Sequence, residues 1–207
     1  GWENKVEMGK GRSAGIEFMA QKTAGKTTGW LSYTLSKSDR KFTKGGINNG
    51  EWFPYKYDRR HSINLTINHK FSDRIDIGAS WVFYTGGTST IPEEKTTVIR
   101  PHNGANNGFL WYGTYDNTNS SPTIGDVSYI EHRNNFRLPA SHRLNLGVNF
   151  NKKTKHGMRT WNISLYNAYN AMNPAWVYRG HNKQGLSVIK KYTLLPLIPS
   201  FTYTYKF

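Results

Sequence analysis

The 207-residue sequence contains no cysteine. Disulfide bonds, thiolate metal ligands and a cysteine nucleophile are therefore excluded. No apolar run approaches the about 18 residues that a membrane-spanning helix needs, so such a helix is excluded too. The first residues, GWENKVEMGKGRS, have neither an initiator Met nor the apolar core of a signal peptide. They indicate a processed or truncated chain.

Acidic residues are scarce: 13 Asp and Glu stand against 28 Lys and Arg, a formal net charge of +15. This surplus suggests a polyanionic partner, and its sign alone does not distinguish nucleic acid, an anionic membrane surface or an acidic ligand. Mean hydropathy is −0.70 although 14% of residues are aromatic. Such a combination is typical of apolar residues dispersed singly along strands.

Alternation with period two is the main structural signal. In the last segment, SFTYTYKF, Phe201, Tyr203, Tyr205 and Phe207 share one parity, and Ser, Thr and Lys residues share the other. Successive side chains of a strand point to opposite faces, so this segment has one aromatic and one polar face. The same pattern marks residues 15–21, 31–36, 63–71, 75–83, 143–151 and 161–165. It predicts about seven strands of roughly ten residues.

The polar faces and the connections bear on the kind of sheet. Asn, Ser, Thr, Gly and Arg dominate the polar positions, which favours a barrel lumen, although any single strand also fits a soluble sandwich. Short links at 22–27, 72–74 and 152–157 alternate with long ones at about 39–59, 86–140 and 171–199. Three such long loops are uncommon in compact soluble domains, whereas outer-membrane barrels alternate short periplasmic turns with long extracellular loops. We expect an all-β fold, a transmembrane antiparallel β-barrel whose C-terminus is periplasmic.

Aromatic residues fall near the expected strand ends and predict two girdles at the membrane interfaces. The outer girdle comprises Trp81, Phe83 and Tyr84, and the inner one Trp30, Phe71, Phe150, Trp161 and Phe207. An odd number of strands does not close a single-chain bacterial barrel, and open edges in hydrocarbon are costly. The chain is therefore expected to be part of a larger barrel.

Several strings carry a family resemblance: GRSAGIEFMAQK, GWLSYTLSKSDRKF, INNGEWFPYKYDRRHSINL, RNNFRLPASHRLNLGVNF, WNISLYNAYNAMNPAWVY and LPLIPSFTYTYKF. In this order they resemble the last strands and loops of a TonB-dependent outer-membrane receptor of Gram-negative bacteria. The resemblance implies a 22-stranded barrel with a plugged lumen, of which residues 1–207 supply about the last seven strands. It also implies energised import of a nutrient through TonB, which would act on an N-terminal part outside this chain. The plug domain is likewise expected outside it.

The string EWFPYKYDRRH gathers aromatic, cationic and acidic residues at the mouth of one strand. Trp52, Tyr55, Arg59 and Arg60 are candidate ligand or loop contacts, because Arg offers a rigid fork to carboxylates. The competing and favoured interpretation is a rim network that anchors the loops to the barrel. Its members are Asp58, His61, Arg133, Asn135 and Arg137.

Exposed rings in the long connections pose the same choice. Trp111, Tyr112 and Tyr115 in one loop, and Trp176 and Tyr178 in the last, would contact a ligand, another loop or a surface lipoprotein that caps the loops. The basic clusters are expected to meet outer-membrane lipid and lipopolysaccharide.

Other classes of function find little support. The seven histidines show no metal-ligand spacing, and no nucleophile-elbow pattern holds Ser, His and Asp, so no enzyme, metal or cofactor is assigned. Nucleic acid is not expected, because the aromatic and polar residues have opposite parity. A passive porin or adhesin-type barrel is the alternative to a receptor, and a soluble basic β-protein that binds polyanions is the third reading.

Overall fold

The computed structural model describes residues 6–99 and 124–207. It is an all-β protein with antiparallel sheets, as the alternation predicts. In the described part of the chain, no helix is both long and apolar enough to cross a membrane. Two compact units are present: Gly1–Ile91 with His132–Phe207 form the first, and Pro92–Glu131 the second.

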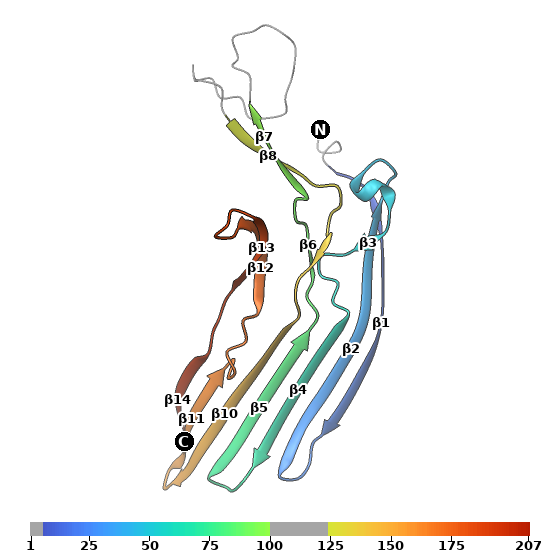
Figure 1. The fold of residues 1–207 in the computed structure, drawn as a ribbon. Helices are drawn as coiled ribbons and strands as arrows, with labels where there is room; N and C mark the ends of the chain where they lie inside the picture. Colours follow the sequence, from blue (N-terminus) through green and yellow to red (C-terminus); the bar gives the residue numbers. More distant parts are fainter. Residues whose placement is uncertain (1–5, 100–123) are drawn as a thin grey trace. The chain divides into compact units, whose positions relative to one another are not determined.

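The first unit is built on one large sheet, in the order β1-β2-β4-β5-β10-β11-β14, with β3 paired to β2 (Figure 1). The strands follow one another along the chain and all pairs are antiparallel. Their bounds are β1 Gly9–Lys22, β2 Thr27–Phe42, β3 Phe53–Pro54, β4 His61–Lys70, β5 Ile75–Tyr84, β10 Ser141–Thr154, β11 Gly157–Tyr166 and β14 Ile198–Lys206. The seven expected strands are therefore confirmed, in sequential order.

The long connections contain structure that the sequence did not predict. Connecting segments of the first unit hold the 3-10 helix η2 (Ile47–Gly50), the hairpin β12 (Pro174–His181) with β13 (Ser187–Thr193), and the pair β6 (Thr88–Ser89) with β9 (Phe136–Arg137). The second unit is the hairpin of β7 (Glu94–Ile99) with β8 (Ile124–Tyr129). Such short hairpins lack long alternating runs, so periodicity alone does not reveal them.

Three short turns join β1 to β2, β4 to β5 and β10 to β11, and they lie at one end of the sheet (Figure 1). In the β4–β5 turn, Lys70 pairs with Asp73 at 2.8 Å. This contact lowers the pKa of the Asp73 carboxyl, first through the hydrogen bond and then through the charge of Lys70. The alternation of short and long links is confirmed.

The register aligns the apolar residues of all seven strands on one face of the sheet, called here the apolar face. Two rows across neighbouring strands are Leu31, Leu65, Trp81, Leu144 and, nearer the short turns, Ile77, Val148, Ile163, Phe201. Because pairing across strands keeps each row on one side, the faces expected strand by strand become one continuous surface.

Two of the rings expected in the girdles, Trp30 and Tyr84, lie on the opposite, polar face, which corrects that prediction. Trp30 is opposite Gln21 and Thr66, and Tyr84 is opposite Ser62. Both have the parity of the polar residues on their strands, so neither belongs to an aromatic band on the apolar face. The predicted positions of Trp30 and Tyr84 near strand ends are confirmed, and their predicted place in an aromatic band on the apolar face is wrong.

The apolar face is largely uncovered in the described residues. Phe53 and Ile91, the two buried hydrophobic side chains among the described residues, lie outside the seven strands, whereas on the apolar face Phe18 is 58% and Phe201 72% exposed. The polar face instead carries a side-chain ladder. The Asp76 carboxylate accepts from Asn149 and Asn151, both at 2.6 Å. The row of hydrogen bonds then continues to β11, where Asn162 donates to Asn149 and Thr160 donates to Asn151.

Candidate functional site

The best-organised polar cluster of the first unit surrounds Asp58, between β3 and β4, at the end of the sheet opposite the short turns. Its side chain is fully buried, and its Oδ1 accepts from the Ser38 backbone N–H at 2.7 Å. Its Oδ2 lies 3.3 Å from the Nε of Arg60. Buried carboxylates need such partners, since an unpaired buried charge is strongly unfavourable.

Arg137 on β9 completes this cluster. Its Nη2 donates to Asp58 Oδ2 at 2.5 Å, and its Nη1 donates to the carbonyls of Asp58 at 2.9 Å and Gly86 at 2.8 Å. The planar guanidinium of Arg137, in the segment before β10, is therefore bonded both to the connection before β4 and to the second residue after β5. Arg suits this position because its fork spans several acceptors in a fixed geometry.

Other amides join the same connections. Asn48 in η2 exchanges two hydrogen bonds with the backbone of Arg133, at 2.7 and 3.1 Å. Asn135 does the same with the backbone of Ile91, at 2.9 Å in both directions. Asn134 donates to the Pro54 carbonyl at 2.8 Å. The segments around residues 48–58, 86–91 and 133–137 are thus held to one another through buried or half-buried hydrogen bonds.

His61, the first residue of β4, and Arg59, two residues before it, lie beside this cluster. The His61 ring contacts the Tyr33 hydroxyl at 2.9 Å and stacks on the Tyr33 ring. The Arg59 guanidinium lies 4.0 Å above the Tyr84 ring. Arg59 is exposed, so its charge faces solvent while the ring supports it from below.

The two aromatic candidates of the EWFPYKYDRRH string also stack on cations. Arg12 lies 4.3 Å from the Trp52 ring, and Arg40 lies 4.1 Å from the Tyr55 ring. Trp52 is 39% exposed. The structure therefore places both rings in contact with β1 or β2, with part of Trp52 open to an external contact.

Trp176 and Tyr178 lie on β12, far from Asp58 along the chain. In the described residues, neither is hydrogen-bonded to the Asp58 cluster. Trp176 stacks on Tyr192 of β13, with ring centroids 4.3 Å apart and planes 7° from parallel. Both candidates are about half exposed, at 49% and 46%. Trp111, Tyr112 and Tyr115 lie outside the described residues.

Two important residues were missed by the sequence reasoning, Asn48 and Asn167. Asn167 is 1% exposed and bonds the Ala171 backbone in both directions and the Leu195 carbonyl, which organises the last connection. Both adopt positive φ, 51° and 53°. Asn tolerates this region better than other non-glycine residues, so Asn in a long connection was the available signal.

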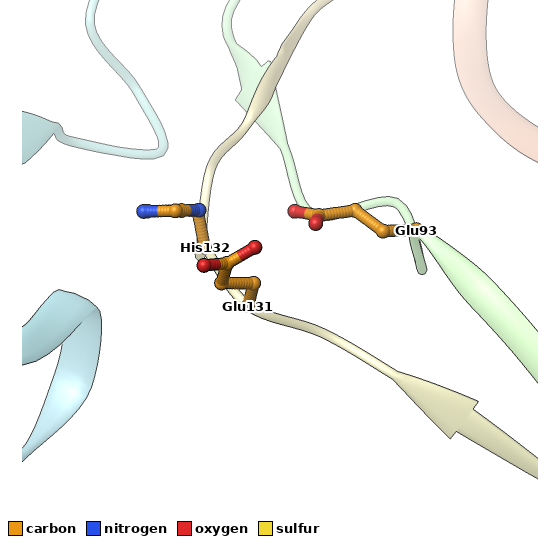
Figure 2. A group of neighbouring side chains, drawn as sticks. All are labelled: Glu93, Glu131 and His132. Carbon is orange, nitrogen blue, oxygen red and sulfur yellow. The ribbon is translucent and has the colours of Figure 1, made fainter.

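Figure 2 shows Glu93, Glu131 and His132, whose potential metal-ligand atoms lie within 4.8 Å of one another. Glu131 and His132 are consecutive in the chain and exposed, and Glu93 is half-buried. Exposed acidic groups commonly gather without an ion. These residues therefore carry no metal assignment.

The arrangement around Asp58 suits binding or anchoring better than acid–base chemistry. Both carboxylate oxygens are already occupied by donors, and in the described residues no hydroxyl is paired with a histidine and a carboxylate in the manner of a nucleophile.

No protein-family model, no curated protein and no solved structure matches this chain.

Proposed function

We propose that this chain forms the C-terminal part of the barrel of a TonB-dependent receptor, which imports a nutrient across the outer membrane of a Gram-negative bacterium. One observation carries the proposal: a continuous apolar face over seven strands, with almost none of its side chains buried. In water, a patch of this extent marks a surface that needs an apolar partner. Lipid provides that partner for every strand at once.

The order of residues along the apolar face supports a membrane rather than a second sheet. Aliphatic residues such as Ile67, Ala79 and Leu146, which form one row across β4, β5 and β10, occupy its middle. Near the short turns lie ring pairs, among them Trp161 with Tyr203 at 4.8 Å. Toward the long connections, the Trp81 Nε1 donates to the Tyr169 hydroxyl at 3.1 Å. Rings with polar tips at both borders of an aliphatic zone are typical of membrane interfaces.

The lengths of the strands support the same proposal. The strands β4, β5 and β11 have 10 residues each, and a tilted strand crosses a bilayer with about 9–11. The two outermost strands, β1 and β14, are paired on one side only within the described residues. Because open edges are unfavourable in hydrocarbon, we propose that further strands of a larger barrel pair with both.

In this proposal the cluster around Asp58 is the rim network that anchors the extracellular loops. Trp52, Arg59, Trp176 and Tyr178 remain candidates for ligand or loop contacts because they are exposed. Outer-membrane lipid, lipopolysaccharide and a surface lipoprotein are the proposed partners on the outside. TonB would act through the N-terminal part of the receptor.

A passive porin or adhesin barrel would share this sheet, so two measurements are needed. The first is fractionation of cells that produce the intact protein, where we expect it in the outer membrane, resistant to urea extraction. Recovery as a soluble monomer would favour the basic β-protein instead. The second is binding of the intact, detergent-purified protein to the C-terminal domain of TonB. Membrane location without that binding would favour the porin or adhesin.

A further inference from the structure

The apolar face of β1 and β2 continues directly into a cationic surface. Ile16 pairs with Leu35 and Phe18 with Tyr33, and both Ile16 and Phe18 are exposed, at 73% and 58%. The next three rows toward the long connections are Ala14 with Lys37, Arg12 with Asp39, and Lys10 with Lys41. Rows of one parity lie on one face, so four cations and one carboxylate follow the apolar rows on the same side.

We propose that this surface, called here the cationic patch (Lys10, Arg12, Lys37 and Lys41), binds the phosphorylated headgroup of a lipid whose acyl chains lie along Ile16 and Phe18. The inference rests on the proposed membrane location of the sheet. It assigns a specific site and a specific chemistry to the lipid partner.

The charges of the patch are only partly neutralised by the protein. Asp39 accepts from Arg12 at 2.9 Å and lies 3.5 Å from the ammonium of Lys37. These contacts orient both cations but balance only one of them. Glu7, which precedes β1, accepts from the Thr43 hydroxyl at 3.1 Å.

Lys10 and Lys41 lie directly opposite each other on the two strands. Like charges in such a cross-strand pair are destabilising. A phosphate between them would replace this repulsion by two attractive contacts. Phosphate is suited to the site because Lys and Arg donate charge-assisted hydrogen bonds to its several oxygens.

Trp52 adds an aromatic ring to this surface. Its ring lies over Arg12, and 39% of the residue is exposed. A Trp that packs on a cation beside an apolar surface is typical of the headgroup region of a bilayer. A free phosphate ion would use the cations alone, whereas a lipid uses the cations, Trp52 and the apolar rows together. We therefore assign a lipid, and not a free phosphate ion, as the occupant of this surface.

The test uses the intact protein in nanodiscs and three probes: diphosphorylated lipid A, the same lipid after removal of its phosphates, and inorganic phosphate. Retention is measured by native mass spectrometry. We expect the protein to retain the phosphorylated lipid at least about tenfold better than the dephosphorylated one, since several cations near one anionic headgroup each add to the attraction. Retention should fall as salt is raised.

The variant Lys10→Gln with Lys41→Gln should reduce retention of the phosphorylated lipid by about tenfold or more. The matched control, Lys152→Gln with Lys155→Gln, removes two cations near the β10–β11 turn at the other end of the sheet. It should change retention by less than about twofold, since these charges lie beyond the screening length from the patch.

Three results would overturn the inference while leaving the receptor proposal intact. They are equal retention of both lipids by the unmodified protein, equal losses in the patch variant and the control, and displacement of the lipid by inorganic phosphate at comparable concentration. Failure of the intact protein to enter nanodiscs would overturn the receptor proposal and this inference with it.

Discussion

The carboxylate of Asp58 and the guanidinium of Arg137 lie 2.5 Å apart, although 79 residues separate them along the chain. Asp58 precedes β4 and Arg137 precedes β10, so this contact joins two connections that leave the sheet at different strands. Because the carboxylate is buried and doubly paired, the contact constrains the conformation of both connections.

Replacing Asp58 by Asn should remove the charge while keeping the shape. Arg60 and Arg137 would lose their anionic acceptor, and we expect the free energy of unfolding to fall by about 1.5–3 kcal/mol. Denaturation of the protein folded in lipid measures this change, and limited proteolysis should cut the connections faster. Asp73→Asn is the control, because Asp73 is 80% exposed in its side chain and its ion pair is solvated, so little change is expected. Equal effects of both variants would contradict the assigned role of Asp58.

Leu146→Arg tests the identity of the apolar face. Leu146 lies opposite Ala79 and Leu165 and is 37% exposed. If lipid covers this position, the substitution should cost about 2–4 kcal/mol near the midplane, measured by folding into bilayers.

The control for Leu146→Arg must come from the polar face. Sequence alone suggests Asn145→Arg, but the Asn145 side chain accepts from the Asn167 backbone N–H at 3.1 Å. Ser80→Arg is therefore the better choice, since Ser80 occupies the same row of the polar face. It should be tolerated, and comparable losses from Leu146→Arg and Ser80→Arg would argue against lipid contact.

The absence of cysteine allows the β5–β10 register to be tested by cross-linking. Ala79 and Leu146 are directly opposite, so Ala79→Cys with Leu146→Cys should form a disulfide efficiently on oxidation. In the pair Ala79→Cys with Gly147→Cys, the cysteine on β10 is moved by one residue. The two thiols then lie on opposite faces of the sheet, so the disulfide should not form. Gel mobility before and after reduction reports the result. Efficient cross-linking of the shifted pair would show a different register.

Gly157→Ala should weaken the pairing of β14 with β11. A Cβ at Gly157 would lie 1.9 Å from the Lys206 carbonyl oxygen, so the backbone must move. We expect a loss of more than about 1 kcal/mol in unfolding free energy, with faster hydrogen exchange in β14. At Gly147 the nearest atoms to such a Cβ are 3.6 Å away, so Gly147→Ala should stay within about 0.5 kcal/mol. The prediction fails if the two variants are equally stable.

Much of the sheet could be read from the sequence because the period-two pattern is local. Each strand carries its own alternation, as in Leu144, Leu146, Val148 and Phe150, and short turns between such strands leave antiparallel neighbours as the simplest pairing. The same parity could have assigned Trp30 and Tyr84 to the polar face. Trp30 and Tyr84 were wrongly placed in the girdles because only their position near a strand end was considered, and not their parity.

By itself, then, the sequence determined the strands, their two faces and the alternation of short and long connections, because each depends on neighbours a few residues apart. The tertiary structure alone decided which residues of the long connections meet. Asn48 reaches Arg133, and Asp58 reaches Arg137, only after the intervening strands have paired in register. Such contacts join segments with no repeating pattern, and their partners depend on backbone paths that no local signal encodes.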